Sequence, residues 1–179
     1  MSVHGDDFTA CGPKKQLDWF EATLRSHYEL TVGGRLGPGK NDDKEGKILN
    51  RIIRVGERGW EMEADPRHAE LIIEELGLIG AKSVVTPGED QNSDISPDND
   101  EVLDEVFAQK SRSLAARANY LSADRPDIQY SVKELCREMS TPKQSSWQKL
   151  KRVGKFLIGK PRLVWNYVWE SQAAEADGL

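Results

Sequence analysis

The sequence is poor in cysteine, with two among 179 residues. Cys11 and Cys136 lie far apart along the chain and lack the spacing of paired metal ligands. This pattern excludes a disulfide framework and a zinc-finger type of site. We therefore expect both side chains to be reduced thiols, which predicts an intracellular protein.

Long apolar runs are also absent from the sequence. No stretch approaches the roughly 18 consecutive apolar residues that a membrane-spanning helix requires. The N-terminus has no basic segment followed by an apolar stretch, so no secretory signal is expected. With 37% hydrophobic residues, the chain can bury one core or two small subdomains. We therefore predict a protein with no membrane partner.

Charge is present in both signs but is unevenly spread. The formal net charge of -5 argues against indiscriminate binding of nucleic acid. From Glu89 to Glu105, however, the chain carries eight acids and no cation, whereas from Lys143 to Arg162 it carries seven cations and no acid. Because a phosphate backbone responds to the local charge, the basic stretch remains a candidate for binding it.

Hydrophobic periodicity predicts alternating strands and helices in the first half of the chain. Two strand-compatible runs around Gly5 predict a hairpin, which Gly12-Pro13 ends. The next elements expected are a helix over Lys14–Tyr28, a short strand over Tyr28–Val32, a loop over 33–46, a hairpin of strands Ile48–Val55 and Trp60–Ala64, and a helix from Asp65 to about Leu76.

The last third of the chain is predicted to be mostly helical. Apolar stripes at helical spacing predict helices over 104–122, 128–139 and 147–157. Prolines at positions 126 and 142 break these helices from one another. Leu163–Trp169 alternates and predicts a terminal strand. The acidic tract that precedes the helices has low apolar content and predicts a flexible linker.

The first candidate site is the Gly5-Asp6-Asp7 turn. Glycine accepts the positive φ of a tight hairpin turn, so this turn would hold Asp6 and Asp7 at its exposed tip. Adjacent carboxylates repel unless a cation lies between them, and Mg²⁺ takes carboxylate oxygens together with substrate phosphates. Such a pair is typical of nucleotidyl transfer with two metals. The alternative is an ordinary solvated turn, because Asp-Asp and Gly-Asp are common in surface turns.

The second candidate site is the polar face of the helix predicted over 147–157. It carries Lys149, Lys151, Arg152 and Lys155. These cations would suit contacts to nucleic-acid phosphates, which position a duplex without reading its sequence. The alternative is ordinary solvation of a charged helix face.

Taken together, these stretches resemble the reverse transcriptase of copia-type retrotransposons. Gly5-Asp6-Asp7 resembles the Asp-Asp hairpin of polymerase palms, and Ile48–Ile53 and Trp60–Pro87 follow in the family's order. The most specific stretch is Arg117–Tyr167, whose matching segments include Arg125-Pro126-Asp127-Ile128, Trp147 and Phe156-Leu157-Ile158-Gly159. His4 and Gly5 depart from the aromatic residue and valine usual in this family, although Gly-Asp-Asp is the form seen in RNA-dependent RNA polymerases.

The resemblance covers roughly residues 3 to 168 and implies an α+β fold, with a partial palm followed by a mostly helical thumb and connection. It divides the chain into a partial palm over 1–64, a thumb helix over 65–88, an acidic linker over 89–103, a helical thumb and connection over 104–169, and a frayed tail over 170–179. The expected chain is therefore the C-terminal half of a polymerase unit, ending before the ribonuclease H domain.

In the intact enzyme, the resemblance implies transfer of a deoxynucleotide to a primer 3′-hydroxyl, directed by an RNA template with a DNA primer. Asp6 and Asp7 would be catalytic ligands of Mg²⁺. The fingers and the first metal-binding aspartate are missing, so we expect no polymerase activity from this chain unless an N-terminal half is supplied. The alternatives are a non-catalytic nucleic-acid-binding module and an inert retroelement remnant.

Overall fold

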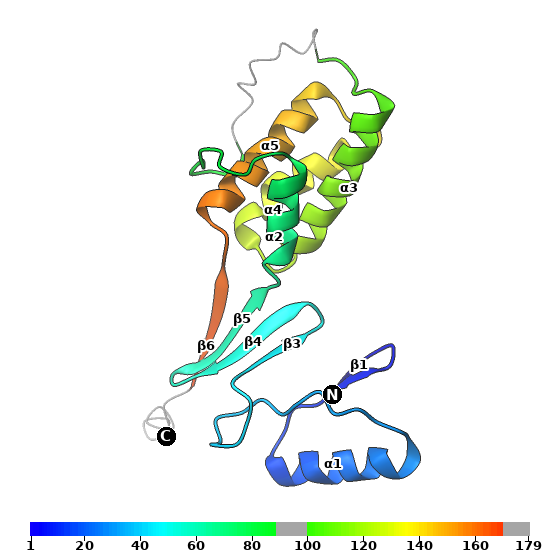
Figure 1. Ribbon diagram of the computed structural model, residues 1–179, viewed down its shortest axis with the longest axis vertical. Coiled ribbons are helices and arrows are strands. Elements are labelled where there is room, and N and C mark those ends of the chain that lie inside the picture. Colours follow the sequence, from blue (N-terminus) through cyan, green and yellow to red (C-terminus); the bar gives the residue numbers. More distant parts are fainter. Residues whose placement is uncertain (89–99, 170–179) are drawn as a thin grey trace, which may run out of the picture.

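The computed structural model describes residues 1–88 and 100–169 (Figure 1). These residues form a mixed α+β fold, which confirms the predicted class. The elements are β1 (Ser2–His4), β2 (Asp7–Thr9), α1 (Lys14–His27), β3 (Glu45–Ile48), β4 (Arg51–Gly56), β5 (Gly59–Ala64), α2 (Arg67–Glu75), α3 (Glu105–Ser122), α4 (Pro126–Arg137), α5 (Gln144–Gly159) and β6 (Val164–Val168). The predicted tail and most of the predicted acidic linker lie outside the described residues.

Helices α2 to α5 pack together at one end of the molecule and enclose the hydrophobic core (Figure 1). The apolar stripes of the sequence supply its centre, where the side chains of Ile72, Leu114, Ile128 and Leu150 are fully buried. Burying each such side chain stabilises the fold by about 1.5–3 kcal/mol. The start of α3 is fixed by its N-cap, Asp104, whose carboxylate accepts a hydrogen bond from the Phe107 amide at 2.9 Å.

A four-stranded antiparallel sheet lies below this bundle, with strands in the order β3-β4-β5-β6. The predicted hairpin between Ile48–Val55 and Trp60–Ala64 is present as β4 and β5. The predicted terminal strand is present as β6, and it pairs with β5 so that Tyr167 lies opposite Trp60. The chain therefore leaves the sheet after β5, builds the bundle, and returns to the sheet through β6.

Two of the predicted strands were placed wrongly. Tyr28–Val32 forms no strand: Tyr28 is extended, with φ -137° and ψ 147°, but no strand of the described chain pairs with this segment. The strand expected from Ile48 is interrupted by a turn at Leu49 and Asn50, both of which have positive φ. Strand β3 instead begins at Glu45, inside the predicted loop, because that turn folds it back onto β4.

The N-terminal hairpin and α1 form a separate part of the fold. Within residues 1–88 and 100–169, strands β1 and β2 pair only with each other. Helix α1 has the predicted amphipathic pattern but buries none of its side chains. Arg35 holds the segment after α1 in place through ion pairs with Asp18 at 2.5 Å and Glu21 at 3.3 Å. Figure 1 shows this part at the opposite end of the molecule from the bundle.

Polar contacts join the sheet to the bundle at the turn between α3 and α4. Asp124 accepts a hydrogen bond from Arg51 Nε at 2.8 Å through its carboxylate, and from Trp165 Nε1 at 3.1 Å through its carbonyl. Nearby, Asn50 Nδ2 donates to the Tyr120 hydroxyl at 3.1 Å. Strands β4 and β6 and the turn between β3 and β4 are thus tied to the same end of α3.

Candidate functional site

The N-terminal hairpin forms with the turn that the sequence predicts. His4 lies opposite Asp7, so Gly5 and Asp6 are the two turn residues. Gly5 has φ 58°, whereas Asp6 is not among the residues with positive φ. A positive φ at the first turn position alone is typical of a type II′ turn, where glycine is favoured. The carboxylates of Asp6 and Asp7 consequently lie at the exposed end of the ribbon.

Asp6 and Asp7 suit a hard cation in their chemistry. Both are exposed, and neither forms an ion pair with another described residue. They offer adjacent carboxylate oxygens, the ligand type that Mg²⁺ prefers. Across residues 1–88 and 100–169, however, no group of three or more His, Cys, Asp or Glu side chains converges on one point. The pair can therefore supply part of a two-metal site, and the described residues do not complete it.

The four predicted basic residues of α5 lie in different environments. Lys149 is neutralised by Glu138, with Nζ 2.5 Å from the carboxylate. Lys151 lies over the indole of Trp147, at 5.8 Å from the ring centroid. Arg152 donates a hydrogen bond to the Thr86 hydroxyl at 2.9 Å. Lys155, one turn after Lys151, is half-buried against the same segment of chain.

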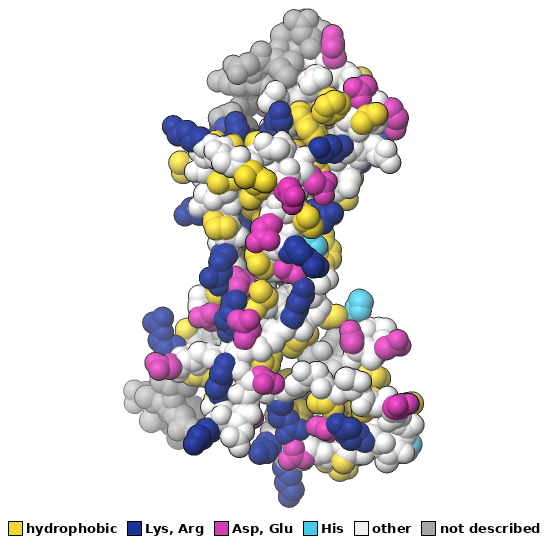
Figure 2. Space-filling model, in the orientation of Figure 1, with side chains coloured by type: hydrophobic (Ala, Val, Ile, Leu, Met, Phe, Trp, Pro, Cys, Tyr) yellow, Lys and Arg dark blue, Asp and Glu magenta, His cyan; other side chains and the backbone are white. Residues whose placement is uncertain are grey.

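Lys151 and Lys155 are therefore the cations of α5 that remain available to a ligand. Their spacing of four residues places them on one side of the helix. Neither forms an ion pair with the residues that the structure describes. Figure 2 shows Lys and Arg side chains gathered over α5 and the neighbouring segment that follows α2. Lys149 faces α4 instead, so the structure does not bring it into this cluster.

The two candidate sites are far apart. Figure 1 places the β1–β2 hairpin near α1 at one end of the molecule and α5 at the other. The sheet, which carries interleaved acidic and basic side chains in Figure 2, lies between them. Any ligand that reaches both sites must therefore be long, as a nucleic-acid duplex is.

Glu63 is a buried carboxylate that the sequence patterns did not single out. Its side chain is 3% exposed and accepts hydrogen bonds from Arg162 Nε at 2.7 Å and from Arg54 Nη1 at 2.5 Å. Burial would raise the pKa of Glu63, but the hydrogen bonds from Arg162 and Arg54 outweigh burial and hold this pKa below its usual value. This arrangement joins three segments and serves the fold.

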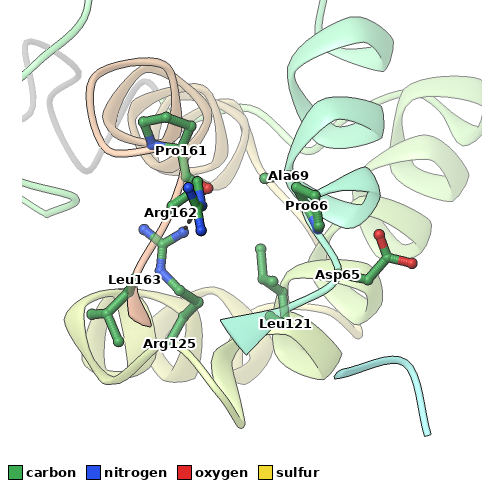
Figure 3. Close-up of a pocket in the computed structure, with 9 residues that line it drawn as sticks. Asp65, Pro66, Ala69, Leu121, Arg125, Pro161, Arg162 and Leu163 are labelled. Carbon is green, nitrogen blue, oxygen red and sulfur yellow. Dashed lines mark hydrogen bonds between the residues drawn. The ribbon is translucent and has the colours of Figure 1, made fainter. Parts of the chain in front are cut away.

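A small cavity at the base of the bundle lies where the bundle meets the sheet. Figure 3 shows Arg125 pointing toward Pro161, while the Asp65 carboxylate points away from the cavity. The cavity has a volume of about 10 Å³, enough for one water molecule. Arg125 is 2% exposed and donates hydrogen bonds to Asp127 and to the backbone carbonyls of Lys160 and Pro161. The cavity therefore holds no substrate.

Comparisons with known proteins found no relative of this chain. No family model, no curated protein and no solved structure matches the chain. Among the residues that the structure describes, no helix combines the length and apolarity needed to cross a membrane. The resemblance to copia-type reverse transcriptases accordingly rests on the sequence motifs.

Proposed function

We propose that the chain is a nucleic-acid-binding part of a copia-type reverse transcriptase. In this proposal, the β1–β2 hairpin supplies two of the metal-binding carboxylates of a complete polymerase site. Helix α5 contacts the phosphates of the template–primer duplex. The observation that carries the proposal is the hairpin itself, because a tight turn at Gly5 exposes two consecutive carboxylates, those of Asp6 and Asp7, at the end of the ribbon.

The role of the hairpin follows from the chemistry of its carboxylates. Bound Mg²⁺ would stabilise the charge that develops on the phosphate oxygens during nucleotidyl transfer. Asp6 and Asp7 would hold the ion through exposed oxygens that no arginine or lysine of the described chain neutralises. A third carboxylate is required to complete a two-metal site. The isolated chain is therefore proposed to bind nucleic acid without extending a primer.

The role of α5 follows from two cations that form no ion pair with the described residues. Lys151 and Lys155 can each approach one backbone phosphate and release the counterions condensed there. Arg152, which is half-buried on Thr86, would support this surface by its packing. Contacts of this type position a duplex and confer no sequence preference.

Equilibrium binding of a fluorescently labelled RNA–DNA duplex, followed by anisotropy, tests this proposal. The double variant Lys151→Glu/Lys155→Glu should weaken binding at least tenfold, because it removes two phosphate contacts and adds like charge. The matched control, Lys14→Glu/Lys15→Glu, makes the same change of charge on the exposed start of α1. It should bind as the unaltered chain does. Equal losses in both variants, or no binding by the unaltered chain, would contradict the proposal.

A further inference from the structure

The two faces of the four-stranded sheet differ in chemistry. Because directly paired residues of antiparallel strands project to the same side, the register defines each face. One face, which we name the aromatic face, carries Ile53, Val55, Trp60, Met62, Trp165 and Tyr167. The opposite face carries most of the charge, including Glu45, Arg54, Glu61 and Glu63.

The aromatic face is open in the described part of the chain. Trp165 is 39% exposed and Tyr167 is 52% exposed. Trp169 follows on the same side and packs edge-on against Trp60, with ring centroids 6.1 Å apart. Figure 1 shows the sheet extending away from the bundle, without a helix lying across it. Aromatic rings therefore line β6 along its whole length.

An open groove lies on the bundle beside the turn that contacts this face. The groove has a volume of about 610 Å³ and lies between the end of α3 and the start of α4. Its lining residues are Asn119, Ser122, Ala123, Gln129, Tyr130 and Lys133. The next residue of the chain, Asp124, accepts the hydrogen bond from the Trp165 indole. The face and the groove therefore meet at the turn between α3 and α4.

The charges along this path favour an anionic ligand. The one charged residue that lines the groove is Lys133, a cation. On the aromatic face the charged residue is Arg51, whose guanidinium already neutralises Asp124. On the opposite face of the sheet, arginines already neutralise the carboxylates of Glu45 and Glu63. Among the aromatic side chains of the groove, Tyr130 is 74% exposed.

We propose that a single-stranded segment of nucleic acid lies along the aromatic face and enters the groove at Tyr130. Unpaired bases stack on the rings of Tyr167, Trp165 and Tyr130, since every base offers a π-face to an aromatic side chain. Lys133 binds a phosphate beside them. An open antiparallel sheet with exposed aromatic side chains suits this task, as it does in other single-strand binders. This inference rests on the proposed function in that both concern nucleic acid, but it uses a different surface.

The test compares two probes that differ only in an unpaired extension. One probe is a blunt RNA–DNA duplex, and the other is the same duplex with an overhang of about 8 nucleotides. The overhang should raise affinity about tenfold or more, and it should quench tryptophan fluorescence. The variant Tyr130→Ala/Tyr167→Ala should lose this gain while binding the blunt duplex as before. Tyr28→Ala, which removes an equally exposed tyrosine after α1, is the control and should keep the gain.

The outcomes separate this inference from the proposed function. If the blunt duplex binds and the overhang adds neither affinity nor quenching, the single-strand surface is wrong although the proposed function stands. If the overhang strand binds alone and the blunt duplex does not, the single-strand surface stands and the role of α5 is wrong. Self-association that disappears in Tyr167→Ala, without any effect of the overhang, would identify the face as a contact between copies and overturn the inference. The quenching measurement needs no variant, so a misfolded double variant leaves the test decisive.

Discussion

Arg162 donates two hydrogen bonds to Glu63, at 2.7 and 2.9 Å, although 99 positions separate the two residues in sequence. Glu63 lies on β5, before the helical bundle, and Arg162 lies after it, at the entry to β6. Arg54 of β4 donates to the same carboxylate. One buried acid therefore fixes the place where the chain leaves the sheet and the place where it returns.

Replacing Glu63 by Gln should destabilise the fold by about 2 kcal/mol. The amide cannot accept from two guanidinium groups as a carboxylate does, and the neighbouring arginines lose their compensating charge. We expect a smaller loss of stability than for a fully buried ion pair, because the Arg162 side chain is 56% exposed. Urea unfolding followed by circular dichroism measures the change. Glu61→Gln is the matched control on the same strand and face, and an equal loss there would contradict this role for Glu63.

The stability of the fold should decrease at low pH, and Glu63 should account for part of this decrease. Arginine hydrogen bonds lower the pKa of Glu63 in the folded state, and the hydrogen bond from Lys47 lowers the pKa of Asp65. A carboxyl group whose pKa is lower in the folded than in the unfolded chain stabilises the fold. Its full contribution is present above its pKa in the unfolded chain, which is about 4. This stability is lost as the pH falls through the folded pKa.

The free energy of unfolding should consequently decrease as the pH is lowered below about 4. Urea midpoints measured across this range for the unaltered chain and Glu63→Gln would test the assignment. The variant should show the shallower decrease, since it lacks one of the carboxylates whose pKa is lowered in the folded chain, which also include Asp65 and Asp100. Parallel curves for the two proteins would mean that other groups determine the acid sensitivity.

The hairpin should depend on glycine at position 5. Gly5 has φ 58° and open space where a Cβ would lie, so Ala at this position suffers backbone strain but no steric clash. A non-glycine residue in this region costs about 1–2 kcal/mol, which would largely melt a two-stranded ribbon. Cross-strand nuclear Overhauser effects between Ser2 and Thr9 should be lost in Gly5→Ala. They should survive in Gly12→Ala, where φ is not positive; their persistence in both variants would count against the type II′ turn.

Divalent cations should bind weakly at the tip of this hairpin. Two carboxylates without a third predict an affinity for Mn²⁺ of about millimolar. Paramagnetic broadening of the amide signals of Asp6 and Asp7 reports such binding, and Asp7→Asn should reduce it severalfold. Glu57→Gln, which neutralises an exposed acid in the β4–β5 turn, should leave the broadening unchanged. Broadening spread evenly over all exposed acids would show that the hairpin has no preference for metal.

Local signals in the sequence predicted most of the elements but few of their long-range contacts. The turn at Gly5 and the break at Pro126 each act through neighbouring residues, so they could be predicted directly. The strand expected at Tyr28–Val32 failed because alternation gives no partner strand. The turn at Leu49 was missed because leucine is rarely found at positive φ.

The candidate sites divide in the same way. Asp6 and Asp7 could be found from the sequence because they are consecutive, one in the turn and one directly after it. The ion pair by which Glu138 neutralises Lys149 could not be predicted, because it depends on how α4 packs against α5. The pairing of β5 with β6 likewise sets Tyr167 beside Trp60 across more than a hundred residues. No local pattern contains this information.

The most direct test of the central claim is the salt dependence of binding to an RNA–DNA duplex. If Lys151 and Lys155 each contact a phosphate, the logarithm of the association constant should fall linearly with the logarithm of salt concentration. The slope for Lys151→Glu/Lys155→Glu should be shallower by about 2, whereas Lys14→Glu/Lys15→Glu should keep the slope of the unaltered chain. Binding that is insensitive to salt, or a slope that both variants change equally, would contradict a nucleic-acid interface on α5.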